Sequence, residues 1–339
     1  MSNKFISTTS AFLLSTSILV ADIPKVTVDI APVHSLVSKV MNGVGKPDLI
    51  IPAGASPHEY QLKPSNAKSL QNADIVFWIG EDLTPWLEKG LSSLAQDASI
   101  TSLLDLSGLE LLSFREGALF EAHDHGEDHD DHDDHDHDKK KHDDHDDHDD
   151  HDHDKKKHDD HDDNDDHAHG EHDPHAWLSP QIAKIWLNVI AAKLSEVDPD
   201  NAAKYFSNAK SARDNVDSLV SEVNSILDPM REKKFVVFHD AYQYFERDFG
   251  ISASGAISLG DASDPSPARL SEIRRRVVDE AVQCVLAEPQ YDPGLVKSVV
   301  EGTDAKTTVI DPLGVSLETG PNLYENLIRN LATNLAKCF

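Results

Sequence analysis

Residues 121–173 are the feature that most restricts how this chain can fold. Sixteen of the 20 histidines lie in this tract with 26 acidic residues and 6 lysines, and a 16-residue unit starting at His132 repeats unchanged from His148. The tract has no apolar residue larger than alanine, so it cannot bury enough surface to offset its ordering entropy. It is therefore predicted to be a disordered loop.

The chemistry of the tract points to transition metals. Neutral imidazole suits Zn, Cu and Ni, and carboxylates add oxygen ligands and negative potential. A solvated acidic linker is the alternative, which the interleaved histidines disfavour. A calcium loop does not fit, because the glycine and terminal glutamate of an EF-hand are missing. Flexible, redundant ligands favour loose collection, so a selective site is expected in the folded parts.

The length and net charge of the chain limit its number of domains and its possible partners. The 339 residues suffice for two cores. The chain carries a net charge of −30, of which −20 falls in the tract, so the remaining −10 argues against a nucleic-acid partner.

The first 21 residues are predicted to be a signal peptide. Lys4 precedes an apolar stretch from Ala11 to Val20, and cleavage is expected after Ala21, although Leu19 makes the cleavage site imperfect. No other segment approaches the length of about 20 apolar residues that spans a membrane. The mature protein is expected to be soluble and exported.

Strand-like apolar runs alternate with helical patterns on both sides of the tract, which is typical of parallel β/α units. Ser65 is expected at the start of one helix, and Ser179 followed by Pro180 predicts another helix start. From Pro199 to Pro229 no proline or glycine intervenes, which predicts one helix of about 30 residues.

The expected fold class is α/β, with two (β/α) lobes that have parallel sheets and are joined by one long rigid helix. We assign residues 22–198 to the first lobe, including the tract, 199–230 to the linking spine helix and 231–339 to the second lobe. A metal site is expected in the cleft between the lobes.

Four histidines lie outside the tract, at His34, His58, His175 and His239. The last three follow strands or occupy loops, where α/β folds present ligand groups. Each alone would more often be structural, but together with the tract they indicate a three-histidine metal site. His34, at the start of a helical pattern, is expected to be structural.

Tetrahedral zinc leaves a fourth position for a carboxylate or water. Glu59, beside His58, and Asp311, at a strand end, are the candidates. The His58-Glu59 pair does not begin a metalloprotease helix motif, because Leu62 stands where the second histidine is required. Capture of an ion therefore fits the pattern better than turnover.

The only cysteines, Cys284 and Cys338, are consistent with one disulfide in an oxidising compartment. Two unrelated thiols are the alternative.

Five ordered segments carry a family resemblance: GASPHEYQLKPS, DPHAWLSP, FVVFHDAYQYFE, CVLAEPQ and DPLG. They resemble the periplasmic zinc-binding receptors of bacterial zinc ABC importers. The resemblance implies zinc bound between the lobes by His58, His175 and His239, with Glu59 as a fourth ligand; some relatives use water or the late aspartate instead. It also implies a disulfide between Cys284 and Cys338.

The same resemblance implies a periplasmic receptor, not an enzyme, that delivers Zn²⁺ to a membrane permease. Other periplasmic zinc carriers are further candidate partners, and receptors of this kind are expected to be monomers. Two other functions remain: a metal buffer in which the tract does the binding, and a zinc hydrolase with Glu59 as its general base.

Overall fold

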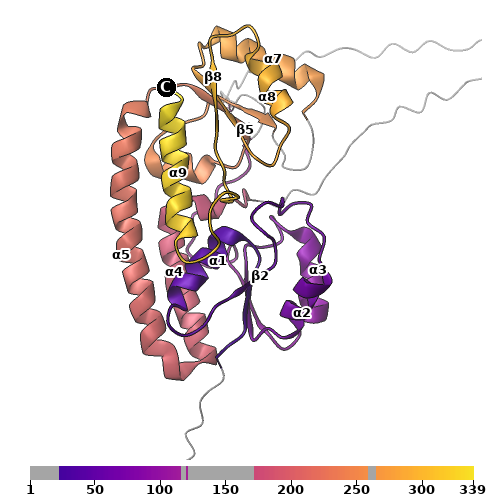
Figure 1. Ribbon diagram of the computed structural model, residues 1–339, viewed down its shortest axis with the longest axis vertical. Coiled ribbons are helices and arrows are strands. Elements are labelled where there is room, and N and C mark those ends of the chain that lie inside the picture. The colour runs from indigo at the N-terminus through magenta and orange to yellow at the C-terminus, as the bar shows by residue number, and fades with distance from the viewer. Residues whose placement is uncertain (1–22, 116–119, 121–171, 259–264) are drawn as a thin grey trace, which may run out of the picture. The chain divides into compact units, whose positions relative to one another are not determined.

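The computed structural model describes residues 23–115, 120, 172–258 and 265–339. Two four-stranded parallel sheets with flanking helices make up this part of the chain, which confirms the predicted fold class (Figure 1). The predicted signal peptide and nearly all of the tract lie outside the described residues. No described helix is both long and apolar enough to cross a bilayer.

The first lobe has the strand order β2-β1-β3-β4. Its elements are β1 (Val26–Val28), α1 (Ala31–Val40), β2 (Asp48–Leu49), α2 (Pro64–Gln71), β3 (Ile75–Trp78), α3 (Pro85–Leu94) and β4 (Ser99–Ser102). All four residues of β3 are buried, as its continuous apolar run predicted.

Two details of the first lobe differ from the sequence analysis. Helix α2 begins at Pro64, one residue before the expected start at Ser65, and Lys63 is its N-cap. The Asn66 side chain accepts a hydrogen bond from the Lys63 backbone at 3.1 Å, so asparagine supplies the cap that serine was expected to give. Helix α3 and strand β4 had not been predicted.

The second lobe has the corresponding strand order, β6-β5-β7-β8. Its elements are β5 (Phe235–His239), α6 (Gln243–Phe249), β6 (Ala256–Ser258), α7 (Pro267–Asp279), β7 (Cys284–Ala287), α8 (Pro293–Val300), β8 (Lys306–Val309) and α9 (Leu323–Lys337). Strands and helices alternate throughout this lobe, as the sequence pattern predicted. Gly250 ends α6 in the left-handed conformation, at φ +62°, which glycine adopts without strain.

Helices α4 (Pro180–Val197) and α5 (Ala202–Leu227) connect the lobes after the short 3₁₀ helix η1 (Ala176–Leu178). The Ser179 hydroxyl accepts from the Ile182 backbone at 3.1 Å and Pro180 stands at N1, as predicted. Helix α5 has 26 residues and is flanked by 3₁₀ turns at Pro199–Asn201 and Asp228–Met230. The predicted long helix is therefore confirmed, with its ends set by the two prolines.

Helix α9 forms a second connection beside α5 (Figure 1). It starts against α1 of the first lobe, where the Tyr324 backbone donates to the Ser35 hydroxyl at 2.9 Å and Lys39 pairs with Glu325 at 2.5 Å. It ends in the second lobe. Helix α9 therefore ties the lobes together in addition to the expected long helix α5.

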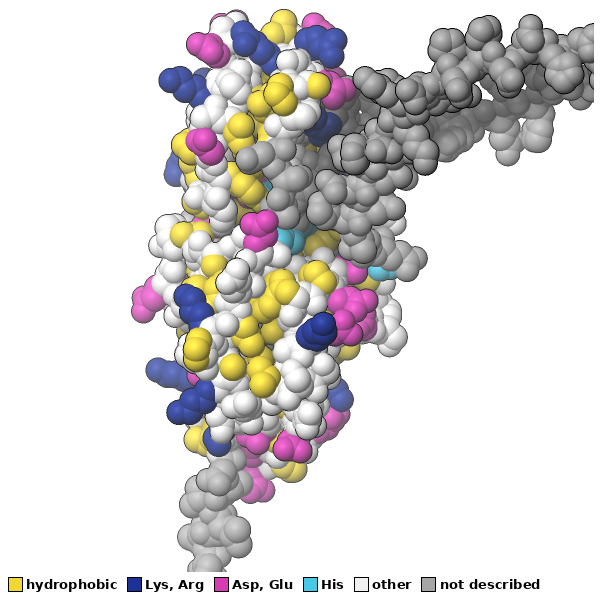
Figure 2. All heavy atoms as spheres, turned by 90° about the vertical axis from the view of Figure 1, so that its right-hand side faces the viewer, with side chains coloured by type: hydrophobic (Ala, Val, Ile, Leu, Met, Phe, Trp, Pro, Cys, Tyr) yellow, Lys and Arg dark blue, Asp and Glu magenta, His cyan; other side chains and the backbone are white. Residues whose placement is uncertain are grey.

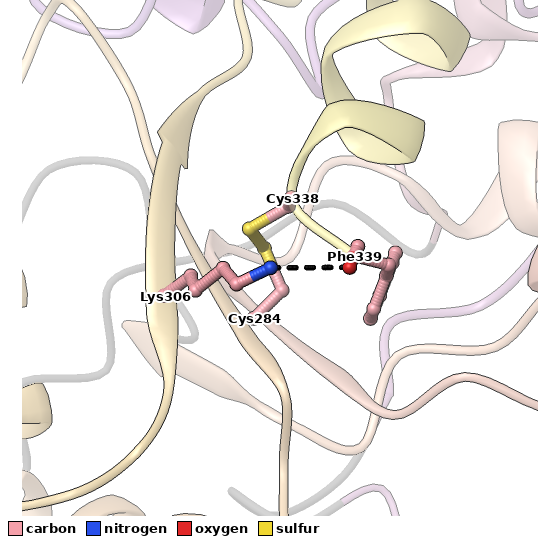
Figure 3. Close-up of a disulfide and its surroundings, with 4 residues drawn as sticks. All are labelled: Cys284, Lys306, Cys338 and Phe339. Atoms are coloured by element: carbon pink, nitrogen blue, oxygen red, sulfur yellow. Dashed lines mark hydrogen bonds between the residues drawn. A yellow bond between two sulfur atoms is a disulfide. The ribbon is translucent and has the colours of Figure 1, made fainter.

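The end of α9 is fixed by a disulfide. Cys338, directly after α9, is bonded to Cys284 at the start of β7, which confirms the predicted bridge (Figure 3). The Lys306 ammonium donates to the terminal Phe339 oxygen at 3.1 Å, as Figure 3 also shows. The C-terminus is thereby held at the end of the second sheet from which β7 and β8 begin.

Candidate metal site

His58 lies in the loop between β2 and α2 and is half-buried. Strand β2 ends at Leu49, so the loop leaves the carboxyl edge of the sheet, where parallel sheets present ligands. The Trp86 indole of α3 donates to the Pro57 carbonyl at 2.7 Å, and the His58 backbone donates to the Ser56 hydroxyl at 3.3 Å. The loop is thus tied to α3 through its backbone.

His175 stands immediately before η1 and is 2% exposed. Its Nδ1 lies 2.7 Å from Oδ1 of Asp173, which also accepts from the His175 backbone at 2.9 Å. The Trp177 ring packs 5.1 Å from the His175 ring, and the Trp177 indole donates to the Pro312 carbonyl of the second lobe at 2.8 Å. His175 therefore has little freedom to rotate.

His239 is the last residue of β5, and the carboxylate of Glu288 follows β7 in the same sheet. Nδ1 of His239 lies 2.7 Å from Glu288 Oε1, and both residues are 4% exposed. In both His175 and His239 a carboxylate oxygen lies within hydrogen-bonding distance of Nδ1. Because a carboxylate accepts hydrogen bonds, this contact favours the tautomer in which Nδ1 carries the proton and Nε2 has the lone pair. This carboxylate–histidine arrangement is the one that orients metal-binding imidazoles.

The three histidines line one pocket together with Trp177, Glu288 and Pro312. Ring centroids lie 5.8 Å apart for His58 and His175 and 5.3 Å apart for His175 and His239. Tetrahedral zinc with Zn–N bonds of about 2.0–2.1 Å places ring centroids roughly 5 Å apart. The distance between the His175 and His239 rings is near that spacing.

The three rings are not equally spaced. The His58 ring lies farther from the His175 ring than the His239 ring does. Among the described residues, no three His, Cys, Asp or Glu side chains stand together in a metal-holding arrangement. Little histidine surface is visible among the described residues on the face shown in Figure 2, in keeping with the burial of His175 and His239.

The two candidates for the fourth ligand have different surroundings. Glu59 is exposed and is not among the residues that line the pocket, so its coordination stays a prediction. Asp311 accepts from the backbones of its own loop, at 3.0 Å from Leu313, 2.9 Å from Gly314 and 2.5 Å from Val315. Its carboxylate thus shapes the loop that carries Pro312.

His34 has the structural surroundings expected for it. Its Nε2 lies 3.0 Å from the Pro47 carbonyl within the first lobe, and burial lowers the pKa of this imidazole. It is not among the residues of the pocket.

A buried charge cluster adjoins the pocket. The guanidinium of Arg115 bonds the carboxylates of both Asp240 and Glu246, with Nη1 2.8 Å from Glu246 Oε2 and Nε 2.9 Å from Asp240 Oδ2. Burial raises the pKa of Asp240, and the bond from Arg115 opposes that rise. Arg115 also lies 3.6 Å from the Phe120 ring centroid, close to where the tract begins.

Sequence reasoning missed the residues that hold the histidines. Asp173 and Glu288 had a usable signal, because both are acids beside a loop or strand end that carries a candidate ligand. Trp86 and Arg115 gave no such signal, because the residues that they contact are distant in the sequence.

The comparisons with known proteins identify the family to which the chain belongs. The family model described as "Zinc-uptake complex component A periplasmic" matches residues 26–338. The high-affinity zinc uptake system protein ZnuA of Brucella abortus (strain 2308) is 49% identical over 313 residues, covering 92% of this chain and 91% of that protein. The protein of the same name from Paracoccus denitrificans (strain Pd 1222) is 44% identical, covering 94% and 92%.

Among solved structures, one described as "Crystal structure of ZnuA" superposes with a TM-score of 0.71 at 21% identity, covering 94% of this chain and 99% of that one. A structure of a ZnuA deletion mutant with zinc bound gives a TM-score of 0.70 at 20% identity, covering 94% and 98%. These two likenesses concern the fold. On the family match and the sequence identities, the chain belongs to the family of periplasmic zinc-uptake complex component A.

Proposed function

We propose that this protein is a periplasmic receptor that captures Zn²⁺ between its two lobes and delivers it to the membrane permease of an ABC-type zinc importer. The observation that carries the proposal is the convergence of His58, His175 and His239 on one pocket, with two of the rings held by carboxylates. Relatives that share the family are named as zinc uptake proteins.

Zinc is the ion that the donor set favours. Three imidazole nitrogens leave one position of a tetrahedral ion for Glu59 or water. Oxygen-rich sites suit Mg²⁺, Ca²⁺ and Mn²⁺ instead. Zn²⁺ is here the cargo, so the site must bind it tightly and still release it.

Export follows from the proposed signal peptide, with cleavage after Ala21 and a mature monomer in the periplasm. The tract at 121–173 acts in this proposal as a loose collector that raises the local zinc concentration, and other periplasmic carriers can exchange zinc with it. No nucleic-acid partner is proposed. We propose capture of the ion and not catalysis as the role of the site, because its histidines occupy strand ends and loops of both lobes.

Calorimetric zinc titration tests the proposal on the mature chain, a variant lacking residues 123–172, and that deletion variant carrying His58→Ala. One tight site should survive the deletion and disappear with the substitution. His34→Gln in the deletion variant is the matched control, because it removes a folded-part histidine outside the pocket, and it should keep the tight site. Loss of all tight binding on deletion would instead make the protein a metal buffer.

A further inference from the structure

Asp173 lies at the centre of a hydrogen-bond network in which every polar group is used. It is fully buried. Besides holding His175, its second carboxylate oxygen accepts from the Gln243 amide at 3.1 Å, and its carbonyl accepts from the Tyr244 hydroxyl at 2.9 Å. Its backbone donates to the Leu112 carbonyl at 2.8 Å. The orientation of this carboxylate therefore depends on residues outside its own loop.

Those outside residues come from the second lobe. Gln243 and Tyr244 begin α6, which starts four residues after His239 at the end of β5. The same two side chains hold the segment that leads out of the first lobe: Gln243 donates to the Ser113 carbonyl at 3.1 Å, and the Tyr244 oxygen accepts from the Leu112 backbone at 3.0 Å. Helix α6 thus binds both flanks of the tract.

We propose that Gln243 and Tyr244 are positioning residues of the zinc site. Acting through Asp173, they fix His175 to the lobe that carries His239, so these two histidines form a preassembled pair. This inference rests on the proposed function. It assigns the two residues no contact with zinc.

The physical reason lies in the cost of ordering ligands. A ligand held in its binding orientation before the ion arrives loses little freedom on binding. His175 and His239 are nearly buried and each is bonded at Nδ1 to a carboxylate. Their ring centroids lie 5.3 Å apart, near the spacing expected for two imidazoles on one tetrahedral zinc.

Removing the Gln243 amide would leave one oxygen of the buried Asp173 carboxylate without its donor. A buried acceptor that loses its partner reorients or recruits water, and either change alters how Asp173 holds the His175 ring. Residues that hydrogen-bond to a metal ligand typically contribute 10- to 100-fold to metal affinity. Gln243 bonds to Asp173 and not to His175 itself, so we expect its loss to weaken zinc binding by roughly tenfold, near the lower end of that range.

The test uses the full mature chain and the variants Gln243→Met and Tyr244→Phe, which keep the side-chain size and remove only the hydrogen-bonding group. The matched control is Arg247→Met. Arg247 lies on the same helix and donates to the Glu110 carbonyl at 3.1 Å, so it holds the same segment without contacting Asp173. Three quantities are measured: zinc affinity by chelator competition, the absorption spectrum of the Co²⁺ form at one equivalent, and thermal unfolding of the metal-free chain.

The expected result is a roughly tenfold loss of zinc affinity in Gln243→Met and Tyr244→Phe, with an altered Co²⁺ spectrum. Arg247→Met should keep both properties. If the two variants unfold at lower temperature but keep wild-type affinity and spectrum, their role is merely structural and the inference is overturned. If the unaltered chain itself lacks a tight zinc site, the proposed function fails first.

Discussion

The two lobes share a strand order but differ in how they hold their histidines. In each sheet the first strand lies inside, flanked by the second and third, and the fourth lies at the edge. The second lobe holds His239 by the Glu288 carboxylate and, through α6, also orients Asp173 and His175. The first lobe holds His58 through the neighbouring carbonyl of Pro57. The same topology therefore carries one histidine that is held by a carboxylate of its own sheet, in the second lobe, and one on a half-buried loop, in the first lobe.

The cores of the lobes differ as well. One hydrophobic cluster runs from the first sheet and its helices through α4, α5 and α9 to one face of the second sheet. The other face of the second sheet packs with α7 and α8 in a separate, smaller cluster that includes Val236, Ile273 and Val299. The disulfide belongs to the larger cluster, where Cys338 at the end of α9 is bonded to Cys284 of β7.

The largest expected effect concerns the attachment between the lobes. Arg115→Met removes the cation from two nearly buried carboxylates, Asp240 and Glu246. Breaking such a buried pair typically costs about 3–5 kcal/mol. Urea unfolding of the metal-free chain should show a loss of that order. Arg247→Met, an exposed arginine on α6, should cost less than about 1 kcal/mol, and equal losses in the two variants would contradict the assignment.

The position of the disulfide predicts where its removal has the largest effect. Replacing Cys284 and Cys338 together by alanine should lower the free energy of unfolding by about 2–5 kcal/mol. Hydrogen exchange should accelerate most in β7 and in the last turn of α9, because the bridge joins these two elements. Protection in β1 and β3 should change less. Uniform acceleration in both lobes would mean that the two cores unfold as one.

The contrast between carboxylate-held and loop-held ligands can be measured directly. Glu288→Gln and Asp173→Asn should each weaken zinc binding about 10- to 100-fold. Trp86→Phe removes one neutral hydrogen bond to the His58 loop, worth about 1 kcal/mol, and should weaken zinc binding about fivefold. Competition titrations with a zinc chelator compare the three variants. A larger effect of Trp86→Phe would reverse the proposed roles of the lobes.

A pH dependence of stability is expected in the first lobe. Asp29 at the end of β1 is fully buried, and burial raises its pKa to about 7, although bonds from the Ile79 and Ile30 backbones oppose the rise. The folded state therefore binds this proton more tightly than the unfolded state, whose pKa is 3.8. The contribution of Asp29 to stability should be greatest at acid pH and decrease as pH rises from about 4 to above 7.

Denaturant titrations of the unaltered chain and Asp29→Asn across this pH range check the sign. The difference in unfolding free energy between the two proteins should depend on pH, because asparagine does not titrate. A constant difference between pH 4 and pH 8 would show that Asp29 does not titrate there.

The sequence by itself determined the elements and the identity of the donors. Capping residues, proline positions and apolar runs act over a few residues, so the strands and helices of the second lobe, the start of α4 at Pro180 and the long helix α5 could be predicted locally. The strand-end and loop positions of His58, His175 and His239 could be found for the same reason. Helix α3 and strand β4 were not predicted, although the sequence patterns that favour them are also local.

Only the tertiary structure decided what holds those donors. The partners lie far apart along the chain: 49 residues separate His239 from Glu288, 70 separate Asp173 from Gln243, and 125 separate Arg115 from Asp240. The residues around a histidine do not show which distant carboxylate will contact it. That contact depends on which strand ends meet at the sheet edge and on how α6 packs. The candidate histidines could be found from the sequence, whereas the carboxylates that contact them are brought there by the packing of the two lobes.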